Sequence, residues 1–274
     1  IEFTASRNAR VKIDGKEVFV HKKKTLNSLH LDTVRIEIFQ GERKLEAKVL
    51  EVTSRFKTQF VGTAQVKKDT TFVIPDNPKI SVDFYIKGNT TVENGQKVLV
   101  DFLDWEIDKK SPRGKVTKIL GFVGENNTEM NAIMYEYGLP VDFSQEVLNE
   151  SELVPEVITE SEIKSRRDMR SVTTITIDPV DAKDFDDAIS IDMKDPNNIK
   201  VGVHIADVAH YVKFGTELDK EAFKRATSVY LVDRCVPMLP ERLSNGICSL
   251  KPNVDRLAFS VVFTLGQDGK IKDT

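Results

Sequence analysis

The chain has 274 residues, of which 40% are hydrophobic and 30% are charged, an ordinary balance for a globular protein. No stretch approaches the ~18 apolar residues that a membrane-spanning helix needs, which excludes such a helix, and the N-terminus lacks the apolar segment of a signal peptide. Two cysteines, Cys235 and Cys248, are too few for a disulfide framework and have no His/Cys cluster near them. We therefore expect no zinc site and a reducing, cytoplasmic setting.

The charges are distributed unevenly along the chain. Residues 1–120 contain 23 Lys and Arg against 16 Asp and Glu, a net charge of +7. Residues 121–274 contain 17 against 27, a net charge of −10. A positive front half suits a polyanionic partner and an acidic rear half suits metal binding, although two ordinary solvated surfaces would give the same composition.

The first 120 residues read as short strands separated by turns, with tight turns at Asp14-Gly15 and Gln40-Gly41. A faint repeat relates Val34–Ile38 to Val98–Phe102 and Lys48–Val52 to Lys115–Ile119. These offsets predict two small barrels in tandem, over residues 1–53 and 54–121, which are OB-like although SH3-like barrels would read much the same. The predicted strands are Arg10–Ile13, Glu17–His21, Thr33–Phe39, Leu45–Val52, Phe60–Val66, Thr71–Ile74, Ile80–Ile86, Lys97–Leu103 and Lys115–Leu120.

Residues 122–170 read as an acidic, helical segment. Helix starts are predicted at Asn126, which precedes Glu129 in a capping-box pattern, at Ser144, and at Thr159, which precedes Glu162 in the same pattern. Gly138 and Pro140 end the first helix. Its predicted apolar face consists of Met130, Ile133, Met134 and Tyr137.

Strands return in residues 171–274, which predicts an α+β domain. The strands are Val172–Ile177, Ala188–Ile191, a third around Val203, and residues 256–265, which precede a turn at Gly266–Gly269. The returning strand has barely begun at the end of the chain, so we expect the chain to be a fragment. A helix is predicted over Thr216–Thr227, with an apolar side made of Leu218, Ala222, Phe223 and Ala226.

The strongest chemical signal is an acidic loop between two of these strands. Five carboxylates fall within ten residues, and such crowding raises the pKa of each unless a cation lies among them. Hard divalent cations, Mg²⁺ first, bind such sets of oxygens. A solvated acidic turn is the alternative, and a calcium EF-hand is disfavoured because its spacing is absent. The five residues are Asp178, Asp181, Asp184, Asp186 and Asp187.

The acidic loop and four later segments, in order, resemble the first part of the RNB catalytic domain, the family of ribonucleases II and R. Those segments are residues 203–212, 226–231, 236–250 and 255–258. In the front half, Glu17–His21 resembles the RNP2 strand of a cold-shock domain, and Phe60–Gly62 with Phe72–Asp76 resembles the second cold-shock domain of such enzymes. The resemblance implies two OB-like cold-shock barrels, the acidic helical segment, and the N-terminal part of an RNB domain over residues 171–274.

The resemblance also implies a function and site residues. RNB enzymes are processive, magnesium-dependent 3′→5′ exoribonucleases that release 5′-nucleoside monophosphates. By resemblance, Tyr230 packs against the 3′-terminal nucleotide, unless it is a core residue, and Phe19 and His21 contact RNA. We expect single-stranded RNA as partner, no small-molecule cofactor, no membrane, and a monomer. The implied catalytic and magnesium-holding residues are Asp178, Asp184, Asp186 and Asp187.

Several neighbouring polar residues receive other interpretations. Asp181 lies outside the implied set of four, and either forms a turn or pairs with Lys183. Because the family does not use a histidine base, we interpret His204, Asp207 and His210 as structural. Arg256 and Lys251 contact phosphate or pair with acids, and the sequence does not decide between these. Bases at residues 22–24 and 113–118 are expected to meet phosphate, which would make RNA affinity sensitive to salt.

Because the family's remaining active-site groups would lie beyond residue 274, we expect this chain alone to bind RNA weakly and to degrade it poorly. A catalytically inactive, RNA-binding relative is the main alternative. A DNA-binding cold-shock protein with an unrelated acidic domain is the other.

Overall fold

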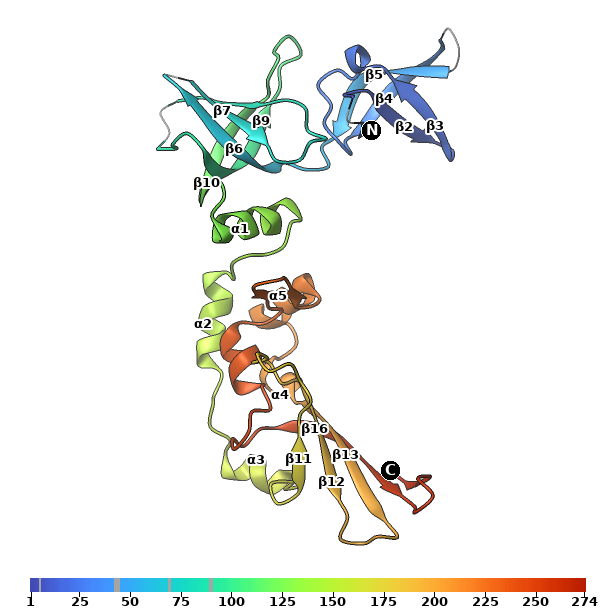
Figure 1. Cartoon of the computed structure of the whole chain (residues 1–274), viewed down its shortest axis with the longest axis vertical. Helices are drawn as coiled ribbons and strands as arrows, with labels where there is room; N and C mark the ends of the chain where they lie inside the picture. The colour runs from blue at the N-terminus through green and yellow to red at the C-terminus, as the bar shows by residue number, and fades with distance from the viewer. Residues whose placement is uncertain (5, 42–44, 69, 89–90) are drawn as a thin grey trace. The chain divides into compact units, whose positions relative to one another are not determined.

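The computed structural model describes residues 1–4, 6–41, 45–68, 70–88 and 91–274. These residues form two compact units, Ile1–Val141 and Asp142–Thr274 (Figure 1). In the part of the chain that is described, no helix is both long and apolar enough to cross a membrane.

The first unit begins with a five-stranded sheet in the order β1-β2-β3-β5-β4. Alternation buries Val18 and Val20 of one strand against Ala47 and Val49 of another, so that one face of the sheet forms a core. Asp14-Gly15 forms the predicted tight turn, with φ of 47° and 78°. The strands are β1 (Glu2–Phe3), β2 (Ala9–Ile13), β3 (Lys16–Val20), β4 (Thr33–Gln40) and β5 (Leu45–Ser54), with a short 3-10 helix at Lys22–Lys24.

A closed five-stranded barrel follows in the order β10-β8-β7-β6-β9. Its core surrounds Phe84, which is completely buried. Gly114 allows a close approach, because a Cβ atom there would lie 2.4 Å from the side chain of Val100. The strands are β6 (Gln59–Lys67), β7 (Thr70–Pro75), β8 (Phe84–Ile86), β9 (Gln96–Asp104) and β10 (Arg113–Phe122).

Both sheets have the strand order of an OB-fold, in which the third strand pairs in parallel with the fifth. This parallel pairing joins β3 to β5 in the first sheet and β8 to β10 in the second. The predicted OB-like fold class is therefore confirmed. Over the described residues, the first sheet is open and does not close into a barrel. Two strand predictions need correction: the strand predicted at residues 80–86 is shorter and forms only β8, and β1 was not predicted. The predicted turn at Gln40-Gly41 borders residues 42–44, which lie outside the described part, so this prediction is not tested.

Helix α1 (Asn126–Glu136) closes the first unit against the barrel. Glu125, rather than the predicted Asn126, stands at the N-cap. The predicted apolar face is partly wrong, because Ile133 is 43% exposed and Tyr137 79% exposed. The helix meets the barrel with Ala132 instead, a small side chain that allows close packing.

The second unit combines short helices with a five-stranded sheet in the order β11-β12-β13-β16-β17 (Figure 1). Its main core gathers Leu218 and Leu243, both fully buried. The predicted capping box at Thr159 and Glu162 is present, and Ser144 and Thr216 cap their helices as predicted. The helices are α2 (Gln145–Leu153), α3 (Glu160–Ser165), α4 (Val208–Tyr211), α5 (Glu217–Arg225) and a π-helix (Arg242–Ile247).

The sheet of the second unit carries the acidic loop at its edge. Phe223 of α5 is 87% exposed, which corrects its predicted place on the buried side, because α5 contacts its neighbours through Leu218 and Ala222. A separate hairpin is made by β14 and β15. The strands are β11 (Thr173–Ile175), β12 (Asp187–Asp192), β13 (Ile199–Ala206), β14 (Val229–Tyr230), β15 (Cys235–Val236), β16 (Ala258–Leu265) and β17 (Ile271–Asp273).

Candidate active site

The acidic loop spans residues 176–187, of which residues 176–186, between β11 and β12, have no regular secondary structure. Asp187 is the first residue of β12. The carbonyl oxygen of Asp186 accepts a hydrogen bond of 2.9 Å from the amide of Ala206 on β13. The C-terminal end of the loop is therefore fixed to the central strands of the sheet.

The four predicted aspartates lie close enough to influence one another electrostatically. The pKa of Asp186 is raised, first by partial burial and then by the negative charges of Asp184, Asp187 and Asp178. Among the residues that the structure describes, no Lys or Arg forms an ion pair with any of the four. The negative charge of the loop is thus not neutralised by the protein.

One oxygen of Asp178 carries the clearest sign of a missing partner. Its Oδ2 atom is buried and has no hydrogen-bond partner among the described residues. A buried, unpaired carboxylate oxygen is costly unless a proton or a cation satisfies it. The donor set is made of hard carboxylate oxygens, which suits Mg²⁺.

The carboxylates do not already form a metal cage. Within the described ranges, no three His, Cys, Asp or Glu side chains are placed to hold a metal ion together. Repulsion between like charges explains this spread, since nothing in the protein draws the oxygens together. The residues fit a magnesium site by chemistry and location, and binding would require the side chains to converge.

Tyr230 lies at the acidic loop although 46 residues separate it from Asp184. Its hydroxyl donates a hydrogen bond to Oδ2 of Asp184, and this bond raises the pKa of Tyr230. The side chain is 65% exposed, which does not fit a core tyrosine. Cys235 is its partner across the β14–β15 hairpin, and partial burial and the charge of Asp184 raise the pKa of that thiol.

Ser249 was not predicted as a site residue, yet it contacts the loop twice. Its Oγ accepts a hydrogen bond of 3.1 Å from the amide of Phe185 and donates one of 2.8 Å to the carbonyl of Lys183. The sequence motif around Cys248 contains this serine, but no spacing rule connects it to a loop 64 residues earlier.

The two histidines of the rear half have structural partners. His204 is 5% exposed and lies between the hydroxyls of Ser190 (2.8 Å) and Ser260 (2.7 Å), and burial lowers its pKa. His210 lies 2.8 Å from Glu162 through Nε2 and 3.3 Å from the guanidinium of Arg166 through Nδ1. These contacts agree with the structural interpretation of both residues.

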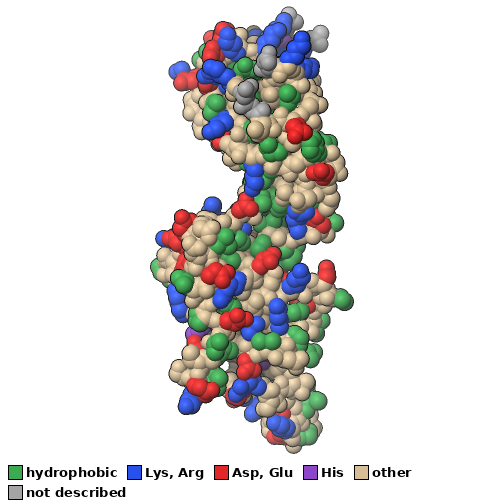
Figure 2. Space-filling view, turned by 90° about the vertical axis from the view of Figure 1, so that its left-hand side faces the viewer, with side chains coloured by type: hydrophobic (Ala, Val, Ile, Leu, Met, Phe, Trp, Pro, Cys, Tyr) green, Lys and Arg blue, Asp and Glu red, His purple; other side chains and the backbone are tan. Residues whose placement is uncertain are grey.

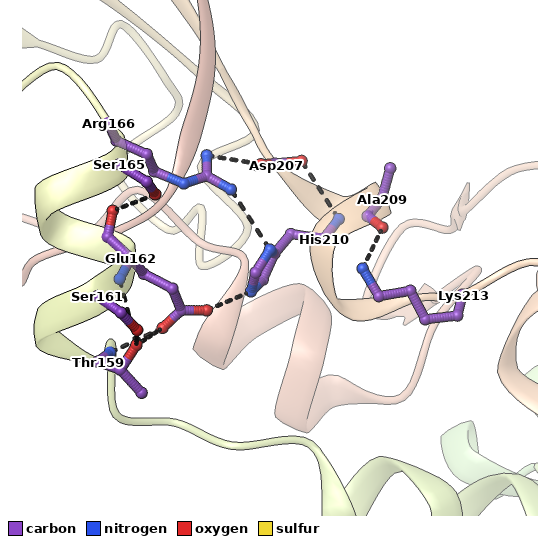
Figure 3. Close-up of polar contacts among 9 residues, drawn as sticks. All are labelled: Thr159, Ser161, Glu162, Ser165, Arg166, Asp207, Ala209, His210 and Lys213. Atoms are coloured by element: carbon purple, nitrogen blue, oxygen red, sulfur yellow. Dashed lines mark hydrogen bonds and ion pairs between the residues drawn. The ribbon is translucent and has the colours of Figure 1, made fainter.

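Figure 3 shows how Arg166 joins helix α3 to the end of β13. Its guanidinium forms a 2.7 Å ion pair with Asp207. The carboxylate of Asp207 also accepts a hydrogen bond from the amide of His210 at the start of α4. Asp207 follows directly after Ala206, the residue whose amide holds Asp186. The cluster therefore supports the strand end against which the acidic loop is fixed.

The remaining predicted alternatives are settled in part. Arg256 donates from its guanidinium to the carbonyls of Ser249, Gly246 and Asp255, contacts that neither predicted alternative named. The side chain of Lys251 has no hydrogen bond or ion pair with the residues described. Asp181 is exposed in the turn closed by Ala182 and makes no ion pair with Lys183 in the described part of the chain, which favours the turn interpretation.

The first unit carries a separate candidate nucleic-acid surface. Phe19 lies on the outward face of β3, opposite Glu46 of β5, and Glu46 in turn lies opposite Phe39 of β4. Lys24 pairs with Glu46 at 3.5 Å and lies 3.9 Å above the ring of Phe39. His21 caps the adjacent 3-10 helix through Nδ1, which accepts the amide of Lys23. Phe39 was not predicted, although its outward place on an alternating strand could have indicated it.

A groove of about 360 Å³ lies where the first sheet meets the barrel. Its lining combines two aromatic with four basic residues, a composition that suits stacking on bases and contact with phosphates. Figure 2 shows basic and acidic side chains mixed over the face in view, so that this face is not a single basic patch. The aromatic and basic residues of the groove are Phe3, Trp105, Arg7, Lys22, Lys23 and Lys79.

Comparison with known protein families matches residues 166–274 to the RNB domain and residues 72–144 to the cold shock domain. The second unit thus carries a match to the RNB domain, and the first unit carries a match to the cold shock domain. The RNB match contains all four predicted aspartates, Tyr230 and Ser249. The predicted domain limits after residues 53, 121 and 170 stay predictions.

Individual relatives extend this assignment. Ribonuclease R of Thermotoga maritima is 41% identical over 278 residues, which cover 99% of this chain and 39% of that protein. The RNase R of Mycoplasma genitalium, solved with ribose-methylated single-stranded RNA, matches with a TM-score of 0.85 at 25% identity, over 99% of this chain and 44% of that one. Yeast Ssd1, described as a pseudonuclease, shares the fold with a TM-score of 0.65 at 17% identity, over 99% of this chain and 41% of that one. The chain thus spans about two fifths of the length of these relatives.

Proposed function

We propose that this chain is the RNA-feeding and aspartate-bearing part of a magnesium-dependent, processive exoribonuclease in the cytoplasm. The enzyme removes 5′-nucleoside monophosphates from the 3′ end of single-stranded RNA. The observation that carries the proposal is the acidic loop, with four unneutralised aspartates and the unpaired Oδ2 of Asp178. The names of its relatives, which are ribonucleases R, support the same reaction.

The residues divide the chemistry between them. Asp178, Asp184, Asp186 and Asp187 would hold Mg²⁺, which when bound activates water and neutralises charge on the attacked phosphate. The exposed ring of Tyr230 offers a face to the 3′-terminal nucleotide, beside Asp184. Such stacking fixes the end of the strand without reading its sequence.

The OB-like unit supplies the contacts that hold the strand. Phe19 and Phe39 both lie opposite Glu46 on the sheet, the ring of Phe39 lies against Lys24, and His21 caps the helix that carries Lys22–Lys24. We expect RNA to be preferred over DNA, because contacts to the 2′-hydroxyl distinguish the two. If single-stranded DNA competes as well as RNA for binding, the DNA-binding alternative is favoured instead.

A chimera tests the catalytic proposal directly. In it, this chain replaces the matching region of Thermotoga maritima ribonuclease R, with which it shares 41% identity. We expect the chimera to release mononucleotides from 3′ ends with Mg²⁺. Asp186→Asn should abolish this release while RNA affinity stays nearly unchanged, and Asp181→Asn, in the same loop, serves as the matched control.

Two outcomes would contradict the proposal. A folded chimera that binds RNA but releases no mononucleotide would favour the inactive, RNA-binding alternative, for which the shared fold of the pseudonuclease Ssd1 gives a precedent. Equal loss of binding and hydrolysis in Asp186→Asn would show that this aspartate is structural. The 274-residue chain alone is expected to release little mononucleotide, and robust release would show that expectation wrong.

A further inference from the structure

The acidic loop has no regular secondary structure, so its shape depends on a few individual hydrogen bonds. Between Lys183 and Phe185, three backbone groups are held by two consecutive residues. The hydroxyl of Ser249 binds the carbonyl of Lys183 and the amide of Phe185, and the amide of Leu250 donates to the carbonyl of Phe185 at 2.9 Å. Ser249 and Leu250 therefore supply hydrogen bonds to the loop backbone of the kind that a neighbouring strand supplies in a sheet.

This contact falls between two of the proposed ligands. Phe185 separates Asp184 from Asp186, and fixing both backbone groups of Phe185 restricts the direction in which each neighbouring side chain leaves the backbone. The carbonyl of Asp186 is held independently by Ala206. The Ser249 hydroxyl, together with the Leu250 amide, thus fixes the backbone between Asp184 and Asp186.

Ser249 is itself rigidly placed. It is completely buried, so water cannot substitute for its hydroxyl. Its carbonyl accepts a hydrogen bond of 3.0 Å from Nε of Arg256. Its amide donates a hydrogen bond of 3.2 Å to the carbonyl of Gly246. Arg256 also binds that same Gly246 carbonyl through Nη2. The end of the π-helix and the guanidinium of Arg256 together hold the serine against the loop.

We propose that Ser249 is a positioning residue for the cation site, acting through the backbone of residues 183–185 to hold Asp184 and Asp186 in place. This inference rests on the proposed function of the acidic loop. Partners that orient metal ligands typically change metal affinity 10–100-fold when they are removed. Ser249 never needs to touch the cation or the RNA to have this effect.

The test compares Ser249→Ala with Ser151→Ala in the 274-residue chain. Ser151 is a matched control because it is 1% exposed in the same unit and its hydroxyl bonds within α2, to the carbonyl of Leu148. Hydrogen–deuterium exchange of residues 183–187 reports the loop without metal, and titration calorimetry with Mn²⁺ reports the site. If Ser249→Ala does not fold, Ser249→Cys, nearly equal in size but a weak hydrogen-bonding group, takes its place.

We expect Ser249→Ala to speed exchange in residues 183–187 and to weaken Mn²⁺ binding by about 10–100-fold, while Ser151→Ala changes neither. Unchanged exchange in the loop would overturn the proposal, and so would a loosened loop with Mn²⁺ affinity within about twofold of the wild type. Failure of the wild type itself to bind Mn²⁺ would refute the cation site, and with it the role of Ser249. That outcome is distinguished from the others because it does not involve a variant.

Discussion

The hydroxyl and the ring of Tyr230 are predicted to have separate functions, which two substitutions can resolve. Tyr230→Phe keeps the ring, which is 65% exposed and available to a base, but removes the hydrogen bond to Asp184. Tyr230→Ala removes both. Base stacking on an aromatic side chain contributes about 1–3 kcal/mol per base, which corresponds to about 5–150-fold in affinity at 1.4 kcal/mol per tenfold.

RNA binding and metal binding are then measured separately on the same three proteins. Fluorescence anisotropy with a 5′-labelled single strand, which leaves the 3′ end free, should show weaker binding by about 5–150-fold for Tyr230→Ala and little change for Tyr230→Phe. Calorimetry with Mn²⁺ should show weaker binding for both variants, because each loses the hydroxyl that orients Asp184. Equal loss of RNA affinity in both variants would refute the assignment of stacking to the ring.

Three further predictions concern stability and charge. Asp32→Ala should lower the unfolding free energy of the first unit by about 3–5 kcal/mol in urea titrations. The reason is that the buried Asp32 carboxylate accepts hydrogen bonds from the guanidinium of Arg55 and from the amides of Leu29 and Phe56. A change below about 1 kcal/mol would contradict this prediction. Burial lowers the pKa of His204, so the contribution of the neutral imidazole to folding stability is complete above pH ~6.5 and is lost as pH falls toward the folded pKa. Between pH 7.5 and 5.5, the melting temperature of the second unit should therefore fall less steeply in His204→Gln than in the wild type. Identical pH profiles would show that His204 is not the cause. Because the pKa of Asp186 is raised, its ionisation above pH ~4 destabilises the metal-free chain. At pH 7, Asp186→Asn should therefore melt at a higher temperature than the wild type without metal, and it should bind Mn²⁺ more weakly. A lower melting temperature of the variant would count against repulsion in the loop.

Local patterns in the sequence were sufficient to predict most of the OB-like strands, although not β1. Alternation of the kind seen at Val18 and Val20 depends only on which face of a strand is buried, and the order of hairpins then limits the pairing. The capping box at Thr159 and Glu162 is equally local, because its hydrogen bonds join residues three apart. The helix faces were less predictable, as Phe223 and Tyr137 show, because a short helix contacts its unit along a narrow strip.

The acidic loop could be predicted from the sequence, but the contacts that shape it could not. Tyr230 reaches Asp184 only because a two-strand hairpin presents it, and Ser249 reaches Phe185 only because a π-helix ends one residue before it, at the cap Cys248. Neither element leaves a periodic pattern. The role of Arg256 likewise became clear only when its three carbonyl partners were seen.

Anomalous diffraction from crystals grown with Mn²⁺ tests the central claim most directly, because it locates the ion without relying on activity. We predict a peak bounded by the carboxylates of Asp178, Asp184, Asp186 and Asp187, with the previously unpaired Oδ2 of Asp178 within ligand distance and the side chains drawn together. A peak elsewhere, or four carboxylates that remain apart at saturating Mn²⁺, would contradict the assignment of this loop as a cation site.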